Sequence, residues 1–195
     1  MRAALALTLL LTVPSVASAD WLLTPFIGTT FGANTNLLLT ANSGNKKFNF
    51  GASFGLLSDG VLGLEASAMH VPHFFETSAS TNVFLTSGVT TLDGSVIVAV
   101  PQAITGYSLR PYLISGIGLM HASAGDIYKF VPFDSNLLAL NLGGGAIGML
   151  SNRTGLRFEL RHYRNLKPDN SAVTLSGAST RISFWRASVG TVFRF

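Results

Sequence analysis

The 195-residue sequence is 48% hydrophobic and only 11% charged, with a formal net charge of +4 and no cysteine. Average soluble domains carry roughly 25% charged residues, so a soluble protein of this composition would expose a large apolar surface. The lack of cysteine excludes disulfides and thiolate metal sites. Because the positive charge is modest and forms no basic stripe, we expect no nucleic-acid partner.

The first 19 residues have the pattern of a secretory signal peptide. Met1-Arg2 is a short basic start, an apolar run follows over residues 3–13, and Ala17-Ser18-Ala19 has the small-x-small form of a cleavage site. The apolar run is shorter than the roughly 20 residues that a membrane-spanning helix needs. We therefore expect cleavage near Ala19, export through the periplasm, and one mature domain over residues 20–195.

The mature chain alternates apolar and polar residues with period two, which predicts strands rather than helices. The expected strands are 21–32, 48–56, 61–71, 83–100, 110–122, 136–150, 155–164 and 181–195. Four polar loops separate them at 33–46, 72–82, 123–135 and 165–180, and three shorter connections lie at 58–60, 101–109 and 151–154. Apolar excess without long apolar runs is typical of membrane barrels, whose every second residue faces lipid. The sequence thus predicts an all-β, eight-stranded, antiparallel transmembrane up-and-down β-barrel.

The two faces of most strands can be assigned from this parity. The clearest strand alternates aromatic or apolar residues with small and polar ones: Phe48, Phe50, Ala52, Phe54 and Leu56 against Asn49, Gly51, Ser53 and Gly55. The assignment is weak for the first strand. In the fifth strand two sets compete for the lipid-facing side, namely Tyr112, Ile114 and Met120 against Leu113, Ile117 and Leu119.

Six charged residues share the inward parity on the third, seventh and eighth strands. They are Glu65, Arg157, Glu159, Arg161, Arg186 and Arg194. An unpaired charge in a confined interior is costly, so we expect a paired network, in which Glu159 can meet Arg186 across neighbouring strands. The network is either a gated ion path or a salt-bridged plug. The plug is favoured because eight strands enclose room for little more than side chains.

Three features resemble one known family. They are the signal peptide ending at Ala19, the strand LRFELRHYR at 156–164 and the ending SVGTVFRF at 188–195. With them the chain resembles the small bacterial outer-membrane β-barrels that include opacity-type adhesins and the membrane domain of OmpA-like proteins. The resemblance implies that the outer-membrane assembly machinery recognises the aromatic last strand, through Val189, Phe193 and Phe195.

Motifs for chemistry are weak. Gly143, Gly145 and Gly148 form a literal G-x-G-x-x-G, but no helix pattern follows, as dinucleotide binding would require. His70 and His73 have Glu76 nearby without matched ligand spacing. We therefore expect no cofactor and no metal.

One segment that contains a histidine resembles part of an enzyme but lacks a residue that the reaction needs. The residues from His162 to Asn165 are similar to the histidine segment of lipid A deacylases, in which a serine follows the histidine by two positions. Arg164 occupies that position here, so the nucleophile is lost and we expect no enzymatic activity. We expect His162 and Arg164 to contact lipopolysaccharide head groups instead.

Two function classes remain. The leading hypothesis is a single-domain, non-enzymatic outer-membrane barrel that acts through external loops in surface structure or adhesion. A monomer is favoured over an oligomer. The alternative is a narrow channel or carrier for small or apolar solutes. A rival fold is the secreted soluble barrel of the lipocalin kind, which would turn Phe48, Phe50 and Phe54 inward.

Overall fold

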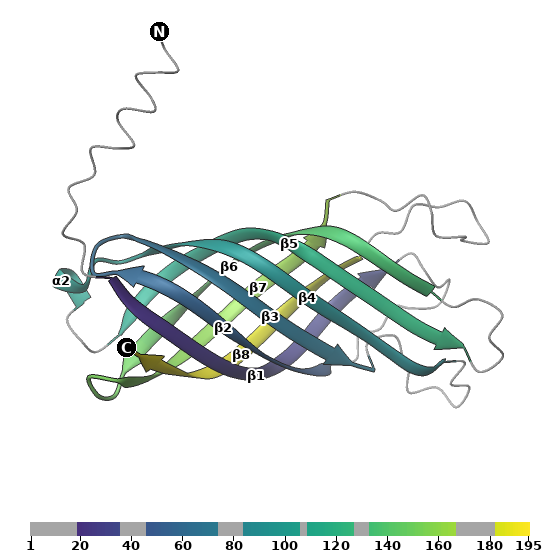
Figure 1. Cartoon of the computed structure of the whole chain (residues 1–195), viewed down its shortest axis with the longest axis horizontal. Helices are drawn as coiled ribbons and strands as arrows, with labels where there is room; N and C mark the ends of the chain where they lie inside the picture. The colour runs from purple at the N-terminus through teal and green to yellow at the C-terminus, as the bar shows by residue number, and fades with distance from the viewer. Residues whose placement is uncertain (1–18, 36–45, 74–83, 106–108, 127–132, 167–181) are drawn as a thin grey trace, which may run out of the picture.

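The computed structural model describes residues 19–35, 46–73, 84–105, 109–126, 133–166 and 182–195 (Figure 1). Its strands are β1 Ala19–Thr35, β2 Lys47–Ser58, β3 Leu62–Pro72, β4 Phe84–Ala99, β5 Arg110–Asp126, β6 Phe133–Met149, β7 Thr154–Asn165 and β8 Ile182–Arg194. One short helix, α2 Gln102–Thr105, lies between β4 and β5. Among these described residues, no helix is long and apolar enough to cross a membrane. Residues 1–18 of the predicted signal peptide lie outside the described ranges.

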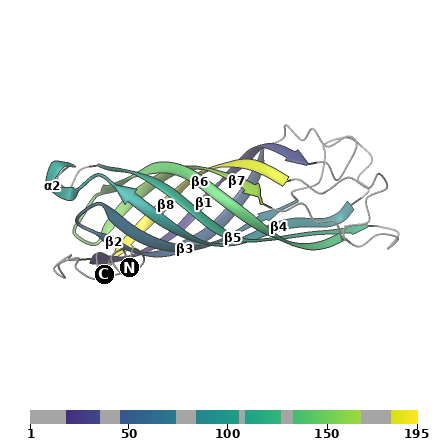
Figure 2. The same ribbon diagram turned by 90° about the horizontal axis from the view of Figure 1, so that it is seen from above.

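Each strand pairs antiparallel with its neighbour in sequence, and β1 pairs with β8 to close the barrel. This confirms the predicted all-β, eight-stranded, up-and-down barrel. β1 begins and β8 ends at the same end of the barrel (Figures 1 and 2), which we call the terminal end. The opposite end is called the distal end. An even number of antiparallel strands requires this placement of the two ends.

The register of the strands fixes how steeply they wind. A row of paired positions that starts at Trp21 passes around the barrel through Leu64, Ser115 and His162 and returns to β1 at Phe31, ten residues further along. A stagger of this kind accompanies strands tilted by roughly 35–45° to the barrel axis. Each strand therefore winds obliquely around a narrow interior.

The side chains sort onto the two faces largely as their parity predicts. In β5, Leu113, Ile117 and Leu119 are exposed on the outer wall, whereas Ile114 and Met120 are buried inside, which settles the ambiguous strand. The outer wall also carries Trp21, Leu23 and Ile27 of β1 and Phe48, Phe50 and Phe54 of β2. A lipocalin-type arrangement is therefore wrong for this chain, because those phenylalanines point outward.

Some strand ends differ from the predicted ones. β5 continues to Asp126 and β6 begins at Phe133, so part of the loop expected at 123–135 is strand. Backbone pairing of Ala124 with Phe133 continues the ladder there, and backbone groups pair whether or not the side chains are polar. The other three loops fall mainly on residues 36–45, 74–83 and 167–181, which lie outside the described residues.

Two apolar clusters lie inside the barrel. The terminal cluster comprises Leu22, Leu57, Ile97, Ala99, Tyr112, Ile114, Ile147 and Val192. The distal cluster comprises Phe26, Met69, Val71, Val89, Met120, Ala122, Leu137, Ala139, Tyr163, Ile182 and Phe184. Tyr112 of the first and Phe26 of the second each contact an arginine of the same charged layer. The charged layer therefore separates the two apolar clusters.

Candidate functional site

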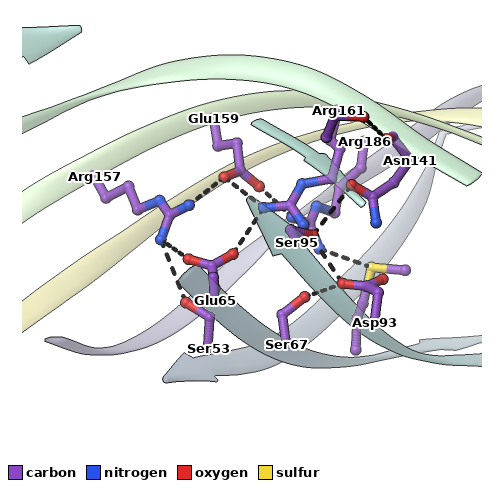
Figure 3. Close-up of polar contacts among 12 residues, drawn as sticks. Ser53, Glu65, Ser67, Asp93, Ser95, Asn141, Arg157, Glu159, Arg161 and Arg186 are labelled. Atoms are coloured by element: carbon purple, nitrogen blue, oxygen red, sulfur yellow. Dashed lines mark hydrogen bonds and ion pairs between the residues drawn. The ribbon is translucent and has the colours of Figure 1, made fainter. Parts of the chain in front are cut away.

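The charged layer is built by β3, β4, β7 and β8 (Figure 3). Arg157, Glu159 and Arg161 occupy alternate positions of β7, so the strand pleat turns all three side chains inward. Glu65 on β3 and Asp93 on β4 face them across the interior, and Arg186 joins from β8. Three cations thus meet three anions in one layer.

Glu159 is the centre of this layer. Its Oε2 atom lies 2.5 Å from Arg157 Nη2 and 2.8 Å from Arg161 Nη2, and its Oε1 atom pairs with Arg186 Nη2. Glu65 pairs with Arg157 and lies 2.9 Å from Arg161 Nη2. Hydrogen bonds from a guanidinium group to a carboxylate are stronger than those between neutral groups. Each of the two glutamates therefore holds at least two arginines in place.

Asp93 forms the edge of the layer. Its Oδ2 atom lies 3.5 Å from Arg161 Nη1 and accepts a hydrogen bond from the Ser67 hydroxyl. On the opposite side, the Tyr112 hydroxyl donates to Glu159 Oε2 at 2.8 Å and accepts from Arg157 Nε at 2.6 Å. Neutral partners thus use hydrogen-bonding capacity that the ion pairs leave open.

The arginines also lie against aromatic rings of the apolar clusters. The guanidinium carbon of Arg157 is 4.8 Å from the centroid of the Tyr112 ring. That of Arg186 is 4.7 Å from the Phe26 ring and 5.4 Å from the Tyr163 ring. Such contacts are favourable for a cation removed from water, and they join the charged layer to the clusters on both sides.

The layer is almost sealed from solvent. Arg161 is 0% exposed, Arg186 1%, and Glu159 7%. Removing charges from water is costly, and only close pairing compensates for it. Inward glycines make room for the large side chains: a Cβ atom on Gly145 would lie 2.6 Å from the Tyr112 hydroxyl oxygen.

The interior leaves little free volume around this layer. The space bounded by Ser53, Glu65, Glu159, Arg161 and neighbouring residues is about 10 Å³, roughly the volume that one water requires. The two apolar clusters lie on either side of it. Within the residues that the structure describes, this packing favours the salt-bridged plug over an ion path.

Five of the six predicted charged residues come together, and the sixth does not. Arg194 has the expected inward parity, but it lies at the terminal end, where its Nη1 atom is 3.3 Å from Asp20 Oδ2. Its side chain is 24% exposed. The prediction that Arg194 belongs to the interior network is therefore wrong, because β8 carries it beyond the charged layer.

Sequence reasoning missed Asp93 and Tyr112. Asp93 shows the inward parity in its strand, and this was the available signal for it. Its partner Arg161 lies on β7, which is not adjacent to β4, so strand order alone gave no reason to pair them. Tyr112 belongs to one of the two sets of residues in β5 that competed for the lipid-facing side, so parity did not place it inside the barrel.

The other predicted residues lie on the outer wall. Val189, Phe193 and Phe195 are 38%, 37% and 76% exposed, and their recognition by assembly machinery stays a prediction. The His162 ring lies 4.8 Å from the Trp185 ring, and Arg164 is exposed.

Neither the glycine motif nor the histidines predicted as weak candidates form a binding site among the described residues. Gly143 and Gly145 lie within β6 rather than at a helix start. His70 Nδ1 is 2.9 Å from Thr90 Oγ1, and His73 is exposed with a φ of 55°. No group of three candidate metal ligands occurs among the described residues, and Glu76 lies outside them.

Comparison with known proteins gives structural similarity only. No protein-family profile and no characterised protein sequence matches the chain. Neisserial surface protein A matches with a TM-score of 0.64 at 17% identity, over 91% of this chain and 99% of that one. The N-terminal β-barrel domain of Pseudomonas aeruginosa OprF matches with a TM-score of 0.52 at 16% identity, over 90% and 97%.

A third similar structure is Ail, the attachment invasion locus protein of Yersinia pestis, in complex with the heparin analogue sucrose octasulfate. Its TM-score is 0.51 at 10% identity, over 90% of this chain and 98% of that one. All three matches span nearly the whole of both chains, so the similarity covers the complete barrel and not a few strands of it. The chain has the fold of the small eight-stranded β-barrels of bacterial outer membranes.

Proposed function

We propose that this chain is an integral outer-membrane protein without enzymatic activity, which acts through its external loops in surface structure or adhesion. The observation that carries the proposal is the closed interior. A charge-balanced layer lies between two apolar clusters, so the inside of the barrel offers a solute almost no space. What remains for contact with partners is the outside of the molecule and its distal end.

The membrane location is supported by the outer wall. Leucine, isoleucine and phenylalanine side chains on all eight strands are exposed there, among them Leu64 at 61% and Leu142 at 61%. In water this surface would be very costly, whereas in a bilayer it is the expected lipid-facing band. Cell fractionation together with a heat-dependent gel shift tests this part. A soluble periplasmic protein without a shift would contradict it.

The role of the loops is supported by analogy with Ail, whose name describes attachment and invasion. The test replaces each of the segments 36–45, 74–83, 127–132 and 167–181 by a short turn and measures binding of whole cells to host cells and matrix. We expect at least one replacement to abolish binding while the heat-dependent gel shift is retained. Full binding after all four replacements would contradict the proposal.

The same protein in a planar bilayer tests the channel alternative. We expect no single-channel conductance at any voltage, because the paired arginines and glutamates occupy the interior. Reproducible conductance steps would favour the channel and overturn the loop-based function.

Three further parts of the proposal have their own measurements. If the signal peptide is cleaved as predicted, the intact mass of the purified protein equals that of a chain that begins at Asp20. Recognition of β8 by the assembly machinery predicts that Phe195→Ser lowers the amount of folded barrel in the outer membrane. Contact of His162 and Arg164 with lipopolysaccharide predicts that their double replacement by alanine weakens lipopolysaccharide retention during purification.

A further inference from the structure

The outer wall has a hollow that the packing of the barrel does not require. It is a shallow, open hollow with a volume of about 570 Å³. The small residues Ala66, Gly94 and Ser115, on β3, β4 and β5, form its floor, and larger side chains such as Phe54 and Ile117 border it. The outward side chains of this hollow are apolar except for Ser115.

Gly94 leaves space in the hollow that a side chain would occupy. A Cβ atom built on Gly94 would meet no heavy atom within 4 Å. The inward Gly118 differs, because a Cβ there would lie 2.6 Å from the Cβ atom of Asp93. Glycine weakens a strand interior and offers no side chain to pack. Crowding explains the inward Gly118, whereas the outward Gly94 lies beside open space.

A polar row lies on the same strands, nearer the distal end. His70, Thr90, His121 and Asn136 are successive partners across β3, β4, β5 and β6. His70 Nδ1 lies 2.9 Å from Thr90 Oγ1, and His121 Nδ1 lies 3.1 Å from Asn136 Oδ1. All four have outward parity, next to the exposed apolar Leu92, Leu119 and Leu138. The outer wall over β3–β6 is therefore polar toward the distal end. Nearer the terminal end it is apolar and contains the hollow.

We propose that this part of the outer wall binds one lipopolysaccharide molecule, with an acyl chain of its lipid A in the hollow and its sugar-phosphate head group at the polar row. The inference rests on the proposed outer-membrane location. A ligand must be apolar beside Gly94 and able to donate and accept hydrogen bonds beside His70 and Asn136, and an outer-leaflet glycolipid meets both demands. A second copy of this chain would fill the hollow without accounting for the polar row.

Native mass spectrometry of the full chain in detergent, with lipid A added as the probe, tests the proposal. Gly94→Leu and Ala66→Leu place larger side chains in the hollow, and the Cβ atom of the leucine at position 94 meets no heavy atom within 4 Å. Ala187→Leu is the matched control, because Ala187 faces outward on β8, across the barrel from β4, and does not line the hollow. We expect one lipid A bound to the wild type and to Ala187→Leu. Binding should fall about tenfold or more in the two filled variants.

The head-group contacts have a separate variant, His70→Ala with His121→Ala, which should weaken lipid A binding and leave binding of a single-chain detergent unchanged. Equal lipid A binding by the wild type and Gly94→Leu would overturn the site. Equal binding of phosphatidylethanolamine and lipid A by the wild type would overturn the assignment to lipopolysaccharide. A dimer that disappears in Gly94→Leu would assign the hollow to a second copy.

The heat-dependent gel shift of each variant separates the two levels of inference. A wild-type protein that fractionates as a soluble protein refutes the proposed membrane function together with this site. A heat-modifiable membrane barrel that binds no lipid A refutes the site alone.

Discussion

The two walls of β7 differ in what holds their side chains in place. On the inner wall, Arg157, Glu159 and Arg161 are buried and paired with specific partners. On the outer wall, Phe158 and Leu160 are 55% and 44% exposed and form no comparable specific network. The inner wall of β7 therefore depends on the identity of each partner, whereas Phe158 and Leu160 on its outer wall need only be apolar. This is the reverse of a soluble barrel, whose charges face water.

The largest effect is expected from Glu159→Gln on the inner wall. The substitution removes the negative charge that faces three buried arginines, and breaking a buried ion pair costs about 3–5 kcal/mol. Urea unfolding in lipid vesicles, followed by fluorescence of Trp21 and Trp185, measures it. Phe158→Leu at the neighbouring outward position should cost less than about 1.5 kcal/mol. Equal losses for the two variants would remove the contrast between the walls.

Leu160→Arg tests the outer wall at the middle of β7. An arginine facing lipid near the bilayer midplane costs about 2–4 kcal/mol, and much less near the interfaces. Leu156→Arg, closer to the terminal end of the same strand, should therefore be milder in the same unfolding assay. Similar losses at both positions would contradict a lipid-facing wall.

Glycines on the two walls should respond in opposite ways. Gly145→Ala forces a methyl group against the Phe158 carbonyl oxygen and the Tyr112 hydroxyl, and overpacking of this kind costs about 1–3 kcal/mol. Gly94→Ala adds the same methyl group to open space, so the free energy of unfolding should stay equal or rise. A larger loss at Gly94 than at Gly145 would reverse the assignment of the two faces.

Among the charged residues, the smallest effect is expected from Arg194→Ala. The pair of Arg194 with Asp20 is about one quarter exposed, and exposed ion pairs contribute about 0.2–1 kcal/mol. The unfolding midpoint in urea should hardly move. A loss as large as that of Glu159→Gln would return Arg194 to the interior network.

The sequence carried most of the fold because period-two alternation is a direct consequence of the strand pleat. The alternation from Phe48 to Leu56 and from Leu156 to Arg164 predicts both the strands and their faces. The exact strand ends were harder to predict from the sequence. The ladder between Ala124 and Phe133 depends on backbone pairing, which polar side chains do not reveal.

Parity was sufficient to select the residues inside the barrel but gave no measure of height along its axis. Glu65, Arg157, Glu159, Arg161 and Arg186 meet, whereas Arg194 has the same parity at the wrong height. Asp93 has the same inward parity and, like Glu65, pairs with an arginine across the interior, so parity alone could have found it. The stagger of ten residues, which sets those heights, is a property of the closed barrel.

The pairing of β1 with β8 has a consequence for synthesis and transport. Leu22 pairs with Arg194, and Thr35 pairs with Ile182, so the first strand made receives its second neighbour only when the last has been released. Until then β1 and β7 each present an unpaired edge, which is prone to aggregation. Bringing such distant segments together is also slow. A chain truncated before Ile182 would keep both edges unpaired, and we expect it to aggregate.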